Sequence, residues 1–225
     1  MTQHPLSHTL RGVYAIIDTQ YISLESIEAA AQSIIDGGAT VIQLRSKTLS
    51  GRDLLTAASI LRNITRRHGV TFIVNDRIDA AMISHADGVH LGQDDIPIEE
   101  ARVILPPPFI IGVSTHNVRE AISAQINRAD YIGFGPIFQT ASKKDAETPK
   151  GLEGLREVRK HVNIPITAIG GIKEDTIMNV LNAGADSVAM ISEILLSADI
   201  AAQVRSLISW IDPSRRGRAR GSADR

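Results

Sequence analysis

Eight short apolar runs, each followed by a segment with helical spacing, constrain the fold of this chain most strongly. The runs are residues 13–17, 41–45, 71–74, 88–91, 109–113, 131–132, 166–169 and 187–190. Apolar strands that alternate with helices are typical of a parallel sheet covered by helices. Eight such units in about 200 residues predict an α/β fold, a single (β/α)8 TIM barrel. An open, doubly wound sheet is the alternative that the same alternation allows.

The helical segments are bounded by residues that commonly start or end helices. Residues 23–36 and 54–67 have helical spacing, and glycines follow both segments, as they often follow helix C-termini. Later helices are expected to start near residues 79, 97, 117, 152 and 175, and the last to end near residue 211. Gly-Ala-Thr at 38–40 and Gly-Ala-Asp at 184–186 each separate a helix from a strand. We interpret both as structural turns at the bottom of the barrel.

Length and composition indicate one barrel domain with a tail. Residues 1–212 are expected to form the catalytic barrel, and the arginine-rich residues 213–225 are predicted to be disordered. A formal net charge of −1 gives no global attraction to nucleic acid or a membrane, and the lack of cysteine excludes disulfides and thiolate sites. The sequence shows no secretory signal and no apolar run of membrane-spanning length, so a cytoplasmic location is expected. A homo-oligomeric state is left open.

One long loop, residues 133–145, contains two glycines, a proline, hydroxyl residues and two lysines. Regular structure is not expected to resume before about Gly151. Loops of this length are usually either functional or disordered. Because the loop offers hydrogen-bond donors and positive charge at the end of a strand, it is predicted to hold a phosphate. The alternative is a solvated surface loop.

The C-terminal ends of the predicted strands gather many polar residues, and active sites of barrels lie at these ends. They are Gln43, Arg45, Lys47, Asn75, Asp76, Gln93, Asp95, Ser114, Thr140, Ser142, Lys143, Gly171 and Ser192. Polar groups buried in such number are costly unless a ligand or water satisfies them. This set therefore predicts a binding site for small molecules.

Two carboxylates in this set, Asp76 and Asp95, end neighbouring strands and can converge. A pair of carboxylates at one site shares a proton or binds a cation. With cationic side chains nearby, Mg²⁺ that bridges to a substrate phosphate fits best. The alternative is a helix N-cap role for each aspartate, and Asp94 is less suited because it alternates away from Asp95.

Two further regions indicate phosphate groups. Gly170-Gly171 and Ile191-Ser192 follow the seventh and eighth strands, the usual phosphate site of this barrel. Arg45, Lys47 and Lys143 add positive charge near the carboxylates, which suits a diphosphate. The alternatives are glycines required for tight packing and cations that are only solvated.

The combined set resembles the thiamine-phosphate synthase family. The matching segments are QLRSK at 43–47, NDR at 75–77, GVHLGQDD at 88–95, GVSTH at 112–116, GPIF at 135–138 with residues 140–145, AIGGI at 168–172 and MIS at 190–192. They occur in family order and cover about residues 13–196. Each segment alone is weak evidence for this family, whereas the whole set in this order is specific for it.

The resemblance implies an enzyme that joins 4-amino-5-hydroxymethyl-2-methylpyrimidine diphosphate to 4-methyl-5-(2-phosphoethyl)thiazole and releases diphosphate. By position, the pyrimidine diphosphate site is Gln43, Leu44, Arg45, Ser46, Lys47, Asn75, Ser114 and Lys143. Arg45, Lys47, Ser114 and Lys143 are the predicted catalytic residues, and Asp76 and Asp95 the Mg²⁺ ligands. The implied thiazole phosphate site is Thr140, Ala141, Ser142, Gly171, Ile191 and Ser192. Gln139 and Ser142 depart from a usual proline and threonine, which puts affinity rather than activity in question.

Two other functions remain at this point. A related thiazole tautomerase would need a general base such as His116, whereas the diphosphate set argues against it. A barrel that only binds a phosphorylated ligand would not need the metal pair. His90 could also be a base, but a hydrogen-bonding wall of the barrel is the favoured interpretation, because no nucleophile is paired with it.

Overall fold

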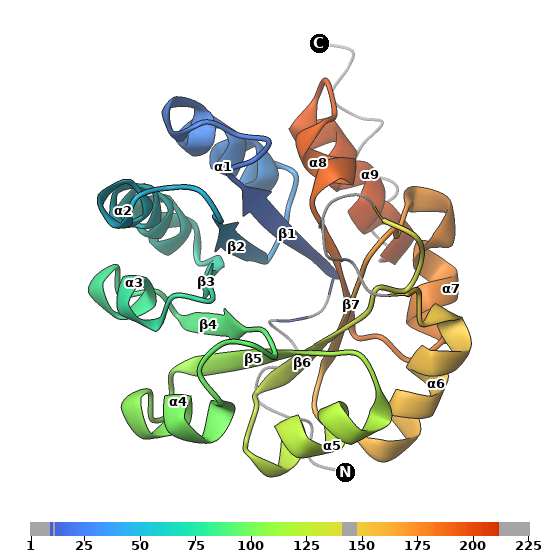
Figure 1. Cartoon of the computed structure of the whole chain (residues 1–225). Coiled ribbons are helices and arrows are strands. Elements are labelled where there is room, and N and C mark those ends of the chain that lie inside the picture. Colours follow the sequence, from blue (N-terminus) through green and yellow to red (C-terminus); the bar gives the residue numbers. More distant parts are fainter. Residues whose placement is uncertain (1–9, 11, 141–147, 212–225) are drawn as a thin grey trace.

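The computed structural model is a closed barrel of eight parallel strands surrounded by helices (Figure 1). The structure describes residues 10, 12–140 and 148–211. Each strand pairs with the next along the chain, and β8 closes the barrel against β1. The predicted TIM barrel is therefore confirmed, and the open-sheet alternative is wrong. The predicted tail at 213–225 lies outside the described residues.

The strands follow the predicted apolar runs closely. They are β1 Gly12–Asp18, β2 Val41–Arg45, β3 Thr71–Asn75, β4 Gly88–Leu91, β5 Ile110–Thr115, β6 Tyr131–Phe134, β7 Ile166–Ile169 and β8 Ser187–Met190. The α-helices are α1 Ile27–Asp36, α2 Gly51–His68, α3 Ile78–Ile83, α4 Ile98–Ile104, α5 Val118–Ile126, α6 Gly151–His161, α7 Ile177–Asn182, α8 Ser192–Leu195 and α9 Ile200–Ile211. Short 3₁₀ turns, η2 Leu24–Ser26 and η3 Glu174–Thr176, precede α1 and α7.

The differences from the expected bounds have local causes. Helix α2 begins at Gly51 rather than at residue 54, because the Ser50 side chain caps it by accepting a hydrogen bond from the Asp53 amide. The segment expected as one last helix is two, α8 and α9. Helix α5 begins as predicted, with Asn117 as its N-cap.

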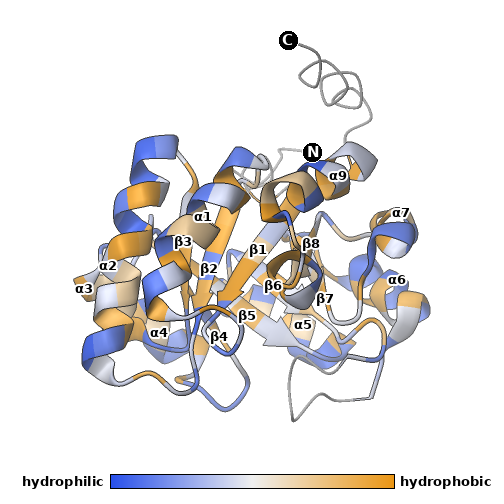
Figure 2. Cartoon of the chain, turned by 90° about the horizontal axis from the view of Figure 1, so that it is seen from above, coloured by the Kyte–Doolittle hydropathy of each residue, from blue (hydrophilic) through white to orange (hydrophobic). Residues whose placement is uncertain are grey.

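The core fills the barrel and the layer between strands and helices. Strands β2, β6 and β8 are buried along their whole length, as strands covered on both faces should be. Figure 2 shows the hydrophobic strands inside helices of mixed hydropathy. Among the described residues, none of the helices combines the length and the apolar character needed to cross a membrane.

We call the N-terminal ends of the strands, with the turns that precede them, the foot of the barrel. Before β4, β6 and β8 a residue with positive φ is followed by Ala-Asp; these residues are His85 (55°), Arg128 (65°) and Gly184 (113°). The Gly-Ala-Asp turn predicted at 184–186 is thus one of three equivalent turns. The turn at 38–40 shares the positive φ, at Gly38 (97°), but has Thr40 in place of the aspartate.

Each of the three aspartates forms the same clamp. Its carboxylate accepts a hydrogen bond from a backbone amide of the preceding strand and from an arginine of a flanking helix. The clamps are Asp87 with Phe72 N (2.8 Å) and Arg62 (2.9 Å), Asp130 with Ile111 N (2.7 Å) and Arg102 (2.6 Å), and Asp186 with Ile166 N (2.8 Å) and Arg159 (3.0 Å). The foot therefore ties helices to strands with paired charges.

Candidate active site

The C-terminal ends of the strands, with the loops that follow them, form the mouth of the barrel. An inner pocket opens there, and its lining includes four of the predicted site residues: Gln43, Arg45, Asn75 and Ser114. The other lining residues are Tyr14, Ile16, His90, Tyr131, Gly133, Thr167, Ile169 and Ala189. The parallel topology brings these residues together from all eight strands, as predicted from the strand ends.

Arg45 is held in place by a residue that sequence reasoning missed. Its guanidinium donates to the carboxylate of Asp18 at the end of β1, and both side chains are buried. The register of β1 and β2 places Asp18 directly beside Arg45. The Asp18 carboxylate also accepts from the Gln20 amide at 2.9 Å. The arginine is therefore fixed at the pocket wall by a buried ion pair rather than free in solvent.

The two predicted metal ligands do converge. Burial, and then the neighbouring carboxylate of Asp76, raise the pKa of Asp95 above its usual value, although the Gly92 amide and Lys47 oppose this shift. Asp95 accepts a hydrogen bond from the Gly92 amide at 2.6 Å, and Lys47 Nζ lies 2.5 Å from Asp76 Oδ2. Asp76 has positive φ, 62°, which for a non-glycine residue marks a constrained position.

This pair fits a hard divalent cation. Two adjacent carboxylates, of which one is buried enough to disfavour its charge, gain from a cation between them. In the described ranges, the structure contains no group of three or more histidine, cysteine or acidic residues that could together hold a metal ion. The described residues would thus supply two carboxylate ligands here, and substrate oxygens and water would complete the coordination, as Mg²⁺ commonly prefers.

Two predicted residues have other roles for their side chains. Leu44 is fully buried in the core, since it alternates away from Gln43 and Arg45 along β2. Ser46 Oγ accepts hydrogen bonds from Thr19 Oγ1 at 2.8 Å and from the Leu49 amide at 3.1 Å, so it shapes the loop. Only the backbone of Leu44 can face a ligand in the barrel.

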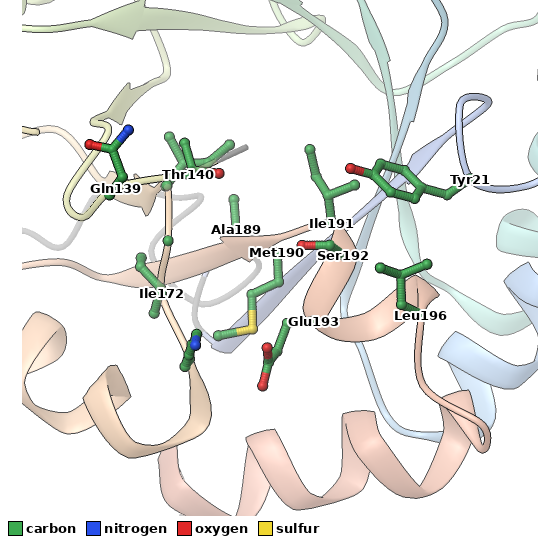
Figure 3. Close-up of a pocket in the computed structure, with 14 residues that line it drawn as sticks. Tyr21, Gln139, Thr140, Ile172, Ala189, Met190, Ile191, Ser192, Glu193 and Leu196 are labelled. Atoms are coloured by element: carbon green, nitrogen blue, oxygen red, sulfur yellow. The ribbon is translucent and has the colours of Figure 1, made fainter. Parts of the chain in front are cut away.

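A second cavity of about 340 Å³ shares lining residues with the inner pocket. Figure 3 shows the residues that line this second cavity. Its lining includes Thr140, Gly171, Ile191 and Ser192, which were predicted to bind phosphate. Sequence reasoning missed Tyr21, whose ring lies near Ile191 and Ser192 in Figure 3. The predicted residues Ala141, Ser142 and Lys143 lie outside the described residues.

The start of the long loop is held against the end of β7. Ile137 N donates to Ile169 O and Phe138 N donates to Gly170 O, both at 2.9 Å, so the two segments lie side by side beyond the ends of β6 and β7. At Gly171, with φ of 64°, an added Cβ would lie 2.4 Å from Gln139 O. The glycine is required by this close approach, which brings Thr140 to the cavity.

A row of hydrogen bonds crosses the barrel interior below the mouth. Gln43 Nε2 donates to Tyr14 Oη (2.8 Å), which pairs with Tyr131 Oη (2.8 Å). Tyr131 Oη pairs with His90 Nδ1 (2.9 Å), and His90 Nε2 pairs with Ser114 Oγ (2.9 Å). The interpretation of His90 as a hydrogen-bonding wall agrees with this geometry, whereas neither tyrosine was singled out from the sequence.

The other polar candidates lie at the edge of the mouth. His116 Nδ1 lies 3.1 Å from Glu120 Oε2 at the start of α5, and Gln93 Nε2 donates to the Ser114 carbonyl at 2.5 Å. Asp94 is exposed, in agreement with the prediction that it turns away from Asp95. None of these three lines the inner pocket.

Comparisons with known proteins identify the family of this chain. Residues 13–194 match the family model described as thiamine monophosphate synthase. The chain is 46% identical over 200 residues to thiamine-phosphate synthase of Chloroflexus aurantiacus. The aligned region covers 88% of this chain and 92% of that relative. It is 51% identical over 171 residues to thiamine-phosphate synthase of Methanoculleus marisnigri. This aligned region covers 76% of this chain and 81% of that relative.

Solved structures show the same barrel. A thiamine phosphate pyrophosphorylase from Pyrococcus furiosus is similar with a TM-score of 0.82 at 37% identity, over 92% of this chain and 98% of that one. A 3-hexulose-6-phosphate synthase is similar with a TM-score of 0.65 at 19% identity, over 88% and 98%, and at this identity the likeness concerns the fold alone.

Proposed function

The chain belongs to the thiamine monophosphate synthase family and has thiamine-phosphate synthase activity in thiamine biosynthesis, and we propose that its two reactants bind side by side at the mouth of the barrel. The observation that carries this proposal is that the inner pocket and the outer cavity share Ile169 and Ala189 as a common wall. The pyrimidine diphosphate enters the inner pocket, and the thiazole phosphate enters the outer cavity.

The residues that line the inner pocket suit an aromatic ring that carries a diphosphate. Gln43, Asn75 and Ser114 offer polar groups to the ring at the wall of the pocket. The diphosphate extends toward Arg45 and Lys47, with Lys143 as a third cation in this proposal. Because Asp18 holds the Arg45 guanidinium, the phosphate-binding group is oriented before the substrate arrives.

The paired carboxylates of Asp76 and Asp95 hold Mg²⁺ in this proposal. Bound there, Mg²⁺ would supply positive charge to the oxygens of the departing diphosphate. Lys47 now forms an ion pair with Asp76 through a side chain that is about half exposed, so it can turn toward the diphosphate when the cation replaces it. The carboxylates and Lys47 thereby serve the same leaving group.

The outer cavity suits the phosphate of the thiazole. Gly171 follows β7 and Ser192 begins α8 after β8, which is where barrels of this kind often bind phosphate. Thr140 adds a hydroxyl from the loop after β6. Ala141 and Ser142, which follow it in the sequence, would bind the same phosphate. The thiazole ring then faces the inner pocket across the shared wall.

The chemistry is displacement of diphosphate by the thiazole nitrogen. The bond between the pyrimidine methylene carbon and the diphosphate oxygen breaks, and diphosphate leaves with the electron pair. The thiazole nitrogen carries a lone pair and no proton, so it forms the new C–N bond without a general base. The charged residues act on the leaving group, which favours departure of diphosphate before attack. The amino group of the pyrimidine stabilises the resulting cation.

A substrate with a trifluoromethyl group in place of the pyrimidine methyl tests this order of events. The group withdraws electrons, so it should slow the single-turnover rate at saturating substrate by orders of magnitude if the ring becomes cationic. Binding should fall far less, because the two groups are similar in size. A similar or faster rate for the fluorinated substrate would leave direct displacement as the mechanism.

A further inference from the structure

The row of hydrogen bonds from Gln43 to Ser114 has a fixed direction that can be derived atom by atom. The Gln43 amide donates from Nε2 to Tyr14 Oη at 2.8 Å. The other hydrogen-bond neighbour of Tyr14 Oη among the described residues is Tyr131 Oη, also at 2.8 Å. Tyr14 must therefore give its own proton to Tyr131, since a proton from Tyr131 would leave the buried Tyr14 hydroxyl without an acceptor.

The same reasoning continues across the barrel. Tyr131 Oη accepts from Tyr14, so its proton is directed to His90 Nδ1 at 2.9 Å. Nδ1 is then the unprotonated nitrogen, and the neutral ring carries its proton on Nε2. Nε2 donates to Ser114 Oγ at 2.9 Å, which leaves the Ser114 hydroxyl proton for another acceptor. Burial raises the pKa of both tyrosines, so each phenol keeps the proton that this order requires.

The barrel is shaped to hold this row. A Cβ added at Gly112 would lie 2.1 Å from Tyr131 Cζ, and one added at Gly133 would lie 3.0 Å from His90 Cε1. Two glycines in the middle of strands β5 and β6 thus provide the space that the two rings occupy. The rings also pack together, with 5.4 Å between their centroids. Such space in the centre of a strand indicates a built arrangement rather than a chance contact.

We propose that Tyr14, Tyr131 and His90 are positioning residues that set the hydrogen-bonding polarity of the inner pocket, and that this polarity selects an aminated heteroaromatic ring over its oxo analogue. Gln43 Oε1 forms no hydrogen bond to a described residue and is the amide atom left to face a ligand, as an acceptor. Ser114 faces the same pocket as a donor. The substrate class rests on the proposed function, whereas the direction of the row does not.

The match to an aminated ring is specific. An exocyclic amino group donates to Gln43 Oε1, and the adjacent ring nitrogen accepts from the Ser114 hydroxyl. In the oxo analogue both groups are reversed, because a carbonyl oxygen replaces the amino group and the ring nitrogen carries a proton. Two acceptors would then face each other at Gln43 and two donors at Ser114. A site built to pair with one arrangement rejects the other strongly, because its own polar groups are left unpaired.

The first test is the protonation of His90 in the ligand-free enzyme. With ¹⁵N-labelled histidine, the ring of His90 is assigned by its loss in the His90→Gln variant. We expect the neutral ring at neutral pH, with the proton on Nε2. A proton on Nδ1, or on both nitrogens, would overturn the proposed direction. This measurement involves no substrate, so it remains decisive even if the proposed function fails.

The second test is the preference for the amino over the oxo pyrimidine diphosphate, expressed as a ratio of kcat/KM values. Tyr131→Phe interrupts the row in its middle, and we expect this preference to fall about tenfold or more. Thr65→Val is the matched control, because it removes a buried hydroxyl from helix α2, outside the inner pocket. An unchanged preference in Tyr131→Phe would contradict the proposal. If Tyr131→Phe does not fold, the His90 measurement decides alone.

Discussion

The foot and the mouth of the barrel both contain charged side chains, but they use them differently. At the foot, three Arg–Asp clamps repeat with the same partners and tie helices to strands. At the mouth, the charges do not repeat: Asp18 holds Arg45, Lys47 contacts Asp76, and Asp95 lies beside Asp76. Repetition at one end and irregularity at the other indicate that the foot is built for stability and the mouth for a ligand.

The two ends also differ in how their charges are balanced. Each clamp joins a cation to a carboxylate that also accepts a hydrogen bond from a backbone amide, so each of these carboxylates is paired within the protein. At the mouth, two carboxylates lie together, and burial with this neighbour raises the pKa of Asp95. Such an arrangement costs stability unless a cation binds. Substitutions at the two ends should therefore separate stability from activity.

The largest effect is expected at the mouth. Asp76→Asn removes one charged metal ligand, and we expect turnover to fall by about 1000-fold or more. Asparagine tolerates the positive φ of this position, so the melting temperature should stay near that of the wild type. Steady-state turnover and thermal unfolding of the same sample provide the check. Near-normal turnover without Mg²⁺ would contradict the assignment.

The next effect is expected at the foot. Arg102 is almost fully buried, and it donates to Asp130 and to backbone carbonyls just after α4, just before β5 and before β6. Arg102→Ala leaves these acceptors unpaired and should cost about 3 kcal/mol of unfolding free energy. Turnover per folded molecule should not change. Arg156→Ala on exposed α6 is the matched control, and an equal loss of stability there would argue against the clamp.

A smaller loss should follow from opening an exposed clamp. Arg62 and Asp87 are both partly exposed, so solvent screens their pairing. Arg62→Ala should cost about 1 kcal/mol or less, because Asp87 keeps its bond to the Phe72 amide. Chemical denaturation of both arginine variants gives the ranking. A larger loss for Arg62→Ala than for Arg102→Ala would show that burial does not set the strength of these clamps.

The smallest expected effect is a change in pH dependence at the mouth. A carboxyl group whose pKa is raised on folding adds stability below its usual pKa of 3.8, and this stability is lost as the pH rises through the folded value. In metal-free buffer, the Asp95→Asn variant lacks this carboxyl group, so it does not lose this stability as the pH rises. The stability of the variant relative to the wild type should thus increase from pH 3 to pH 7. A stability difference that stays constant or decreases with pH would mean that the surroundings of Asp95 do not raise its pKa.

Sequence reasoning reached the fold and the strand-end residues for a common reason. Apolar runs with regular spacing determine strands, and a closed parallel barrel places the end of every strand at one rim. Gln43 and Asn75 could therefore be assigned to one pocket without coordinates. The turns at 38–40 and 184–186 were likewise visible, because both begin with Gly-Ala between a helix and a strand.

The roles of the residues that were missed are set by strand register and by the packing inside the barrel, which the sequence does not state. Asp18 lay within a strand end, but only pairing of β1 with β2 shows that it holds Arg45. Tyr14 and Tyr131 were counted as apolar strand residues, whereas their hydroxyl groups meet at the centre. The glycine at position 112, in the middle of β5, was the available signal, since it marks close approach of a bulky group.

The most direct test of the division between mouth and foot is the binding of diphosphate in the presence of Mg²⁺, measured by calorimetry. Three proteins are compared: the wild type, the double variant Asp76→Asn/Asp95→Asn, and Arg102→Ala at a temperature where it is folded. We predict that affinity is lost in the double variant and equals that of the wild type in Arg102→Ala. Unchanged affinity in the double variant, or an equal loss in both, would contradict the account.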